Sequence, residues 1–420
     1  MAEKKSSVFN RLKLEPPSWW YEGQIPAAAW GLLPVSAIYG ALVQRRFRKA
    51  CAYRSKLPVI CVGNFTAGGA GKTPVALKLA SLLRDQGRKP GFLTRGFGGI
   101  ERGPHLVDPV LDDAARVGDE PLLLAEAAAT VVSRDRPLGA RLLETLGLDT
   151  IIMDDGFQNP SLKKDFSLIV IDAGAGIGSG RVFPLGPLRA PLGFQAGMAD
   201  AIVILGAKTR SADVLEQING SLRRRTPSPQ PYPARGEGVG CGLCNSVPSA
   251  HPPPLADAVT LSGKLAKGEL SGEGQDEGAF FARGKNVFEA RIVSLSTDET
   301  RSGRFLAFCG IGRPAKFFDT LRDAGVTAVK ARAFPDHHPY TEADARSLLA
   351  EAKALQAGLL TTGKDLVRLK GAAGARAELY RAALALPITV EFSGNDEALL
   401  LKAIYSCISG QSCRSVPGDA

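Results

Sequence analysis

The chain has 420 residues, of which 45% are apolar and 22% are charged. This balance excludes an intrinsically disordered chain, and the length exceeds one ordinary core, so about two domains are expected. The formal net charge is +10, and residues 1–56 contain ten Lys and Arg side chains against three Glu. A basic end indicates either nucleic acid or an anionic membrane surface as a partner.

The first predicted element is the apolar segment 25–43, which contains no charged side chain. All three tryptophans of the chain lie in or just before it: Trp19, Trp20 and Trp30. The basic cluster 45–49 follows directly, and this combination is typical of a membrane anchor. Pro26 and Pro34 disfavour a straight spanning helix, so a spanning helix, an interfacial helix and a helix buried against the protein remain alternatives. The anchor accounts for the positive charge, so no nucleic-acid partner is expected.

Beyond residue 56, short β-rich apolar runs alternate with helical patterns, which predicts a parallel sheet with crossover helices. The expected strands are 57–64, 89–96, 129–135, 149–155, 166–173 and 200–208. The expected helices between them are 74–86, 121–129 and 138–146. Residues 1–56 are therefore a membrane-associated segment, and residues 57–219 an α/β domain.

Residues 220–300 are rich in Pro, Gly and Ser over most of their length, and we interpret them as a partly disordered linker. A second, smaller α/β domain is expected over residues 301–420. Its predicted strands are 304–312, 326–334, 358–365 and 386–392, and its predicted helices are 314–325, 341–355 and 396–408.

The segment 64–74, NFTAGGAGKTP, connects the first strand to the first helix. It ends in Gly-Lys-Thr as a phosphate-binding loop does, although Thr66 stands where the usual pattern has its first glycine. Backbone N–H groups of such a loop converge on phosphate oxygens at a helix N-terminus. A plain glycine-rich turn is the alternative. The predicted nucleotide site consists of Thr66, Ala67, Gly68, Gly69, Ala70, Gly71, Lys72 and Thr73.

Two pairs of adjacent acids lie at the ends of predicted elements of the first domain. Asp154 and Asp155 end the strand 149–155, and adjacent carboxylates repel each other unless a cation is bound. With the Thr73 hydroxyl they indicate a Mg²⁺ site, whereas solvated turn acids are the alternative. The second pair, Asp119 and Glu120, is ambiguous, because Asp119 also suits a helix N-cap.

The segment 334–340, FPDHHPY, gathers Asp336, His337 and His338, and so contains two of the four histidines of the chain. An imidazole beside a carboxylate is a common acid–base pair. Metal binding is the weaker alternative, because adjacent histidines point in different directions.

Eight segments of the chain, including those described above, occur in the same order as in a known family. They are VGNFTAGGAGKTP (62–74), LTRGFGG (93–99), VGDEP (117–121), DDGFQ (154–158), GSGRVFPLGPLR (178–189), GIGRPAKFF (310–318), FPDHHPY (334–340) and TTGKD (361–365). Together they resemble the tetraacyldisaccharide 4′-kinases, also called lipid A 4′-kinases. The N-terminal apolar segment fits the same family, in which threonine is usual at the position of Thr66. The resemblance implies a P-loop NTPase-like domain followed by a smaller α/β domain.

The resemblance also implies the reaction, the transfer of the ATP γ-phosphate to the 4′-hydroxyl of tetraacyldisaccharide 1-phosphate, a lipid A precursor. By this analogy Asp119 is the base, tuned by His337, and Lys72 neutralises phosphate charge. The implied metal ligands are Thr73, Asp154, Asp155 and Glu120, and the implied phosphate clamps are Arg95, Arg134, Arg181 and Arg189. The expected location is the cytoplasmic face of the inner membrane of a Gram-negative bacterium. No motif specifies an oligomeric state.

Three residues depart from the family pattern, since Asn159, Ala190 and Gly363 stand where the family commonly has His, Glu and Glu. Ala190 removes a carboxylate beside Arg189, so a weakened pseudo-kinase is one alternative. A membrane-bound P-loop switch that binds GTP is another. The segment 361–365 disfavours the switch, because it lacks the Asn-Lys-x-Asp pattern that recognises guanine.

Overall fold

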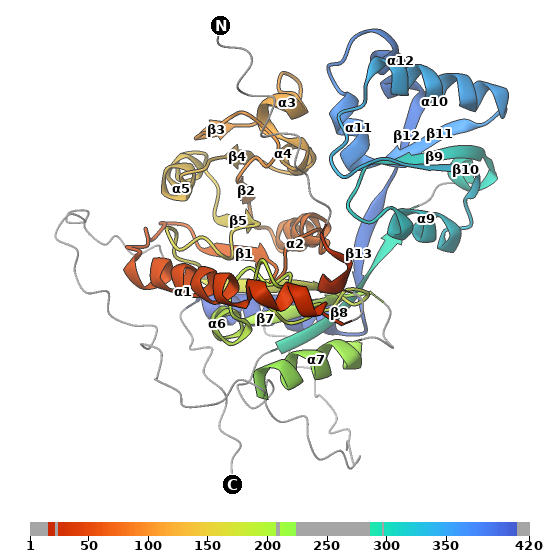
Figure 1. Cartoon of the computed structure of the whole chain (residues 1–420). Coiled ribbons are helices and arrows are strands. Elements are labelled where there is room, and N and C mark those ends of the chain that lie inside the picture. Colours follow the sequence, from red (N-terminus) through yellow and green to blue (C-terminus); the bar gives the residue numbers. More distant parts are fainter. Residues whose placement is uncertain (1–15, 22–23, 207–210, 224–285, 296–297, 410–420) are drawn as a thin grey trace, which may run out of the picture.

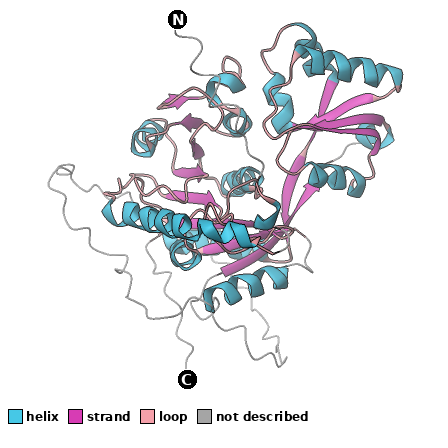
Figure 2. Cartoon of the chain, viewed as in Figure 1, coloured by secondary structure: helices cyan, strands magenta, loops and turns pink. Residues whose placement is uncertain are grey.

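Two β-sheets organise the part of the chain that the structure describes, and they form two lobes (Figure 1). The structure is a computed structural model and describes residues 16–21, 24–206, 211–223, 286–295 and 298–409. Figure 2 shows that helices flank the strands in both lobes, as the α/β prediction required. The predicted fold class is therefore confirmed.

The first lobe contains nine strands among the described residues. In spatial order they are β13 (Ile388–Phe392), β8 (Asn286–Ser294), β7 (Ala201–Leu205), β6 (Phe166–Asp172), β1 (Val59–Gly63), β5 (Thr150–Asp154), β2 (Pro90–Thr94), β4 (Thr130–Val132) and β3 (His105–Leu106). All neighbouring pairs are parallel except the two at the sheet edges, where β13 and β3 run antiparallel to β8 and β4. The six strands predicted for this domain correspond to β1, β2, β4, β5, β6 and β7.

Both faces of this sheet are buried, because alternate residues of its strands enter two different cores. On β1, Ile60 and Val62 join a core that the helices α2 and α13 cover. Val59 and Cys61 join a core on the opposite face, against α5, α6 and α7. The α-helices of this lobe are α1 (Leu33–Lys49), α2 (Lys72–Asp85), α3 (Ala114–Val117), α4 (Asp119–Ala125), α5 (Arg136–Glu144), α6 (Leu192–Met198), α7 (Ser211–Arg223) and α13 (Asp396–Ile408).

The second lobe contains a parallel sheet in the order β10 (Thr327–Ala333), β9 (Arg304–Cys309), β11 (Gly358–Thr362) and β12 (Ala383–Leu386). Its helices are α8 (Asp298–Ser302), α9 (Pro314–Asp323), α10 (Glu342–Ala354), α11 (Gly363–Leu369) and α12 (Gly374–Ala382). Thr341 caps α10 in a capping box with Asp344.

The predicted domain boundaries are wrong at two places. Residues 220–300 were expected to be a linker, but β8 is an internal strand of the first sheet, between β7 and β13. Residues 301–420 were expected to form one domain, yet β13 and α13 belong to the first lobe. The second lobe is thus inserted between two paired strands of the first. Residues 224–285 lie outside the described part of the chain.

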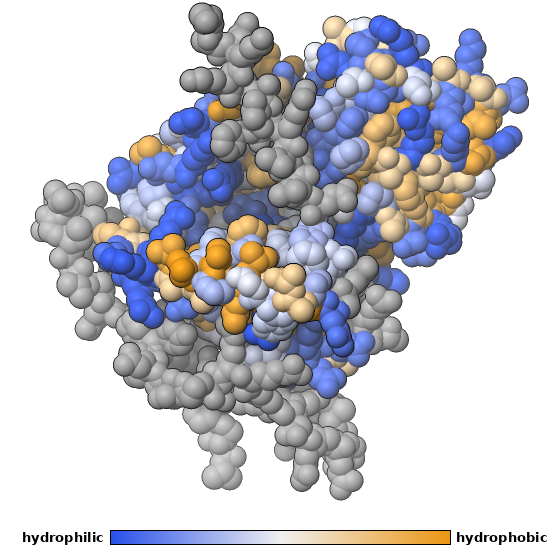
Figure 3. Space-filling model, in the orientation of Figure 1, coloured by the Kyte–Doolittle hydropathy of each residue, from blue (hydrophilic) through white to orange (hydrophobic). Residues whose placement is uncertain are grey.

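The N-terminal apolar segment forms two short 3₁₀ helices, Ser18–Trp20 and Ala27–Leu32, and then α1. One side of α1 packs on the protein: the Ser36 hydroxyl donates to the Val182 carbonyl over 2.7 Å, and the Phe47 ring contacts Phe194. Within α1 only Ser36 and Gly40 are buried, which excludes the buried-helix alternative. The outer side is apolar, and Figure 3 shows this band along α1. Its exposed side chains include Trp30, Leu33, Val35, Ile38 and Leu42.

Candidate active site

The phosphate loop lies between β1 and α2, at the carboxyl edge of the first sheet. Gly71 caps α2 in a left-handed conformation with φ of 85°, and a Cβ there would lie 2.4 Å from the Leu205 side chain. Glycine is therefore required at this position for two reasons, backbone conformation and space. Lys72 and Thr73 form the first turn of α2, where orphan N–H groups favour anions.

Neighbouring segments hold the shape of the loop. The Asn64 side chain donates to the Thr66 carbonyl, and Ala67 N donates to the Pro187 carbonyl. The Tyr21 hydroxyl donates to the Ala67 carbonyl over 2.6 Å, so the N-terminal segment contacts the loop directly. Thr66 itself forms a β-bridge with the segment before Arg189. These contacts stabilise the turn at the position where the usual pattern has its first glycine.

Asp154 and Thr73 form the part of the site that suits a divalent cation. The Thr73 hydroxyl lies 3.3 Å from Asp154 Oδ2, while the buried Asp154 Oδ1 has no hydrogen-bond partner among the described residues. Burial and the neighbouring Glu120 carboxylate raise the pKa of Asp154 to about 7. An orphaned buried carboxylate oxygen beside a hydroxyl fits Mg²⁺, which takes few protein ligands and completes its shell with water and phosphate. The described residues contain no cluster of three His, Cys, Asp or Glu around a common centre.

Asp155 occupies a different environment from its neighbour. It has a left-handed backbone with φ of 50° and pairs with two cations, Arg189 Nη1 at 2.8 Å and Lys72 Nζ at 3.5 Å. Burial alone would raise the pKa of Asp155, but Lys72 and Arg189 outweigh burial and lower it. The structure therefore brings Lys72, Arg189 and both predicted acids together.

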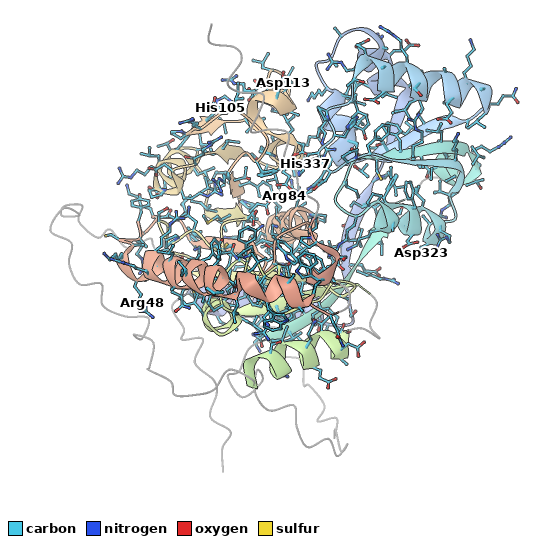
Figure 4. All side chains as sticks on the ribbon, in the orientation of Figure 1. Arg48, Arg84, His105, Asp113, Asp323 and His337 are labelled. Carbon is cyan, nitrogen blue, oxygen red and sulfur yellow. The ribbon has the colours of Figure 1, made fainter. Side chains whose placement is uncertain are left out.

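Asp119 and His337 meet across the boundary between the lobes, where Figure 4 shows His337. His337 Nδ1 lies 3.0 Å from Asp119 Oδ2, although the two residues are 218 positions apart. Asp119 is not a helix N-cap, because Gly118 caps α4 and Asp119 is its first residue. The neighbouring His338 serves the second lobe instead, since it pairs with Asp344 and stacks on Phe334.

Two cationic residues of α11 reach the same acids and were not predicted as site residues. Lys364 Nζ lies 2.5 Å from Glu120 Oε1, and Arg368 Nη2 lies 2.5 Å from Asp119 Oδ2. Burial alone would raise the pKa of Asp119, but His337 and Arg368 lower it overall. Lys364 belongs to the segment 361–365 noted in the sequence, and Arg368 lies one helical turn further on.

The remaining predicted arginines are spread around the site. Arg95 is exposed and acts electrostatically on the buried Arg136, which in turn interacts with Asp155. Arg134 is exposed, and its backbone N–H bonds to the Arg102 carbonyl. Arg181 instead stacks on the Trp30 ring beside the apolar helix, 5.0 Å from its centroid.

The three departures from the family pattern have clear places in the structure. Asn159 forms a turn in which its side chain accepts from Ser161. Ala190 is buried, and its carbonyl accepts from Gln195, whose amide also pairs with Gln158. The preceding residue, Arg189, contacts Asp155, and its Nη1 lies 3.4 Å from Gln158 Oε1. Gly363 begins α11, where a Cβ would lie 3.3 Å from Leu123.

A second set of contacts joins the lobes beside the phosphate loop. Asp172, at the end of β6, pairs with Arg313 Nη1 at 2.9 Å and with Lys316 Nζ at 2.7 Å. The Arg313 guanidinium also lies over the Tyr21 ring, and both residues line a small hollow together with residues of the phosphate loop.

A parallel sheet, a glycine loop ending in Lys72 and Thr73, and acids at the adjacent strand end define a P-loop NTPase-like α/β protein.

The chain belongs to the tetraacyldisaccharide-1-P 4′-kinase family, whose family model matches residues 28–237 and 254–405. It is 42% identical to a tetraacyldisaccharide 4′-kinase of Methylobacterium radiotolerans, over 89% of this chain and 94% of that protein. It is 38% identical to the enzyme of the same name from Brucella anthropi, over 91% and 93%. The crystal structure of LpxK from Aquifex aeolicus, solved in complex with ATP, shares the fold with a TM-score of 0.59. That comparison covers 91% of this chain and 99% of that one at 23% identity.

Proposed function

We propose that this protein transfers the γ-phosphate of ATP to the 4′-hydroxyl of tetraacyldisaccharide 1-phosphate. The observation that carries the proposal is the contact between Asp119 and His337, 3.0 Å apart, which supplies an acid–base pair at the lobe boundary. The phosphate loop supplies Lys72 and the helix N-terminus for the nucleotide. A kinase needs both parts, since phosphoryl transfer depends on charge neutralisation and an oriented nucleophile.

The residues act on the two substrates in distinct ways. Asp119 accepts the proton of the 4′-hydroxyl as the bond from O4′ to the γ-phosphorus forms, with His337 stabilising the carboxylate. The bond between the γ-phosphorus and the β–γ bridging oxygen breaks, and ADP leaves with that electron pair. Lys72 balances charge on the β- and γ-phosphates. In the structure Lys72 contacts Asp155, so nucleotide binding exchanges this partner for phosphate oxygens.

Thr73, through its hydroxyl, and Asp154, which has an unpartnered buried oxygen, would hold Mg²⁺ in this site. When bound there, Mg²⁺ neutralises phosphate charge and holds the phosphate oxygens in place. Glu120 lies within electrostatic reach of Asp154, and Asp155 holds Lys72 and Arg189. We therefore infer that Thr73 and Asp154 are direct ligands and that Asp155 organises the surrounding cations.

The membrane-facing part of the proposal rests on α1. The helical segment Ala27–Lys49 is the one stretch of the described chain long and apolar enough to cross a bilayer. However, α1 packs along the protein through Ser36 and Phe47 and turns Ile38 and Leu42 outward. This favours a helix that lies in the interface of the inner membrane at its cytoplasmic face. The exposed cations at its end suit anionic headgroups: Arg45, Arg46, Arg48 and Lys49.

A guanine-reading switch is disfavoured by the contacts of the segment 361–365. Lys364 is occupied by Glu120, and Asp365 is fully buried with Tyr340 and Arg368 as donors. Neither side chain is placed to read a base.

The test is transfer of labelled γ-phosphate from Mg-ATP to tetraacyldisaccharide 1-phosphate in detergent micelles. We expect turnover by the unchanged protein, a loss of about 100-fold or more for Lys72→Ala, and about 10²–10⁴-fold for Asp119→Ala. ATP binding without any transfer by the unchanged protein would contradict the proposal and favour the pseudo-kinase alternative.

A further inference from the structure

Arg368 is a buried arginine of the second lobe whose guanidinium ends on the first lobe. Its side chain is 7% exposed. Nε and Nη2 both donate to Asp119 Oδ2, over 2.9 and 2.5 Å. Nη1 donates back into its own lobe, to the Gly310 carbonyl and to Asp365 Oδ1, each over 2.7 Å. The guanidinium therefore connects the two lobes at Asp119, the proposed catalytic base.

Asp365 fixes the orientation of this guanidinium. It is 0% exposed and accepts hydrogen bonds from Gly310 N at 2.8 Å, the Tyr340 hydroxyl at 2.9 Å and the Thr362 hydroxyl at 2.6 Å. A buried carboxylate with this many donors has little freedom to rotate. The bond from Arg368 to Asp365 is thus made to a rigid partner, and Arg368 is presented to the first lobe in one arrangement.

The contacts that Asp119 receives from the second lobe all fall on one of its oxygens. Arg368 donates to Oδ2, and His337 Nδ1 lies 3.0 Å from the same oxygen. Oδ1 instead accepts the Glu120 backbone N–H at 3.0 Å. The carboxylate is 4% exposed, so water does not compete for Oδ2. Three nitrogen atoms that contact Oδ2 also fix the orientation of Oδ1, which accepts the Glu120 N–H.

We propose that Arg368 is the positioning residue of the Asp119–His337 pair, and that it orients the carboxylate for proton transfer. The packing of α11 against α4 places Arg368 at Asp119. Without Arg368, His337 alone holds Oδ2 from the second lobe, and the carboxylate rotates about its Cβ–Cγ bond. The inference rests on the proposed kinase function.

The test compares Arg368→Gln, Arg368→Lys and Asp365→Asn in the full chain with lipid substrate in micelles. Arg346→Gln is the matched control, because Arg346 is an exposed arginine of the same lobe that pairs only loosely with Glu342, at 3.6 Å. We expect Arg368→Gln to lower kcat by about 10- to 100-fold with the KM for Mg-ATP within about twofold. We expect Arg368→Lys to recover part of the lost kcat. The kcat of Asp365→Asn is expected to lie between those of Arg368→Gln and the unchanged protein, and Arg346→Gln is expected to behave as the unchanged protein.

Thermal unfolding of each variant separates positioning from folding. A folded Arg368→Gln protein with unchanged kcat would overturn the inference, and so would a rise in KM with kcat intact. If Arg368→Gln does not fold, unchanged kcat in both Arg368→Lys and Asp365→Asn overturns it equally. Absence of transfer by the unchanged protein defeats the kinase proposal, whereas normal transfer by both the unchanged protein and the folded variants defeats this inference alone.

Discussion

At Asp119 a single buried carboxylate takes part in both the proposed chemistry and the attachment of the lobes. Its partners are His337 and Arg368 from the second lobe, and the carboxylate is 4% exposed. Breaking a buried ion pair by removing one partner leaves the other charge uncompensated, at a cost of about 3–5 kcal/mol. Stability and activity are therefore linked at this residue.

This link predicts a pH-dependent effect of Asp119→Asn on the free energy of unfolding. The folded-state pKa of Asp119 is lowered, so the stability that its charge provides is present above the unfolded pKa and is lost as pH falls through the folded value. We expect the variant to be destabilised by about 3–5 kcal/mol at pH 7, and the difference to shrink as pH falls below about 4. Chemical denaturation from pH 7 to pH 3 measures this, and a constant difference across that range would contradict it.

Residues that act locally could be predicted from the sequence, and residues that act at a distance could not. Lys72 and Thr73 were found because a loop between a strand and a helix carries its own signature. Arg368 was missed because its partner lies 249 positions away and a single arginine in a helix has no signature. The available signal was its spacing of three from Asp365, which places both side chains on one face of α11.

At the level of elements, α1 has two sides with opposite requirements. Ser36 and Gly40 fit against the protein, where a Cβ on Gly40 would lie 3.2 Å from Pro191. The opposite side exposes apolar residues that a soluble surface does not need, beside four exposed cations. We therefore propose that one side of α1 contacts the protein and the other side contacts the membrane.

The exposed side of α1 predicts that Ile38→Glu weakens membrane binding without unfolding the protein. Burial of one such side chain contributes about 1.5–3 kcal/mol, so we expect vesicle affinity to fall by about 10- to 100-fold. Sedimentation with anionic phosphatidylglycerol vesicles measures the effect. The control is Leu138→Glu, an exposed apolar position on α5. Equal binding by Ile38→Glu and the unchanged protein would show that α1 is not the contact.

The strand predictions recovered the buried strands of the first sheet but missed β8. Every residue of β1, β5 and β6 is buried, and each strand contains an uninterrupted apolar run of three residues or more. β8 reads NVFEARIVS, with only two of its nine residues buried, and it follows a Pro- and Gly-rich stretch. Its partner β13 was predicted as a strand, but sequence gives no indication of which sheet a strand joins.

For the molecule as a whole, two separate groups of ion pairs hold the lobes together. One group is centred on Asp119 and Glu120, and the other joins Asp172 to Arg313 and Lys316. Because these groups lie on different elements, α4 and the end of β6, they restrain the second lobe at two points.

Asp172→Asn is accordingly predicted to loosen the lobes while leaving each lobe folded. Removing the carboxylate breaks the ion pairs with Arg313 and Lys316, so we expect a larger radius of gyration in small-angle scattering and a changed KM for ATP. The control is Glu391→Gln, which removes an exposed ion pair with Arg291 inside the first lobe. Identical scattering and KM for Asp172→Asn and the unchanged protein would contradict the prediction.

The return of the chain to the first sheet has a consequence for how the protein is made. On the ribosome, β1 to β7 emerge long before β13 and α13, which supply Val390, Leu400 and Ile404 to the core behind the phosphate loop. The nucleotide lobe therefore cannot finish folding ahead of the second lobe, as a domain completed early in synthesis could. A nascent chain or a truncated product that stops before residue 388 exposes an apolar sheet face, and its fate is degradation or aggregation rather than a free-standing nucleotide-binding domain.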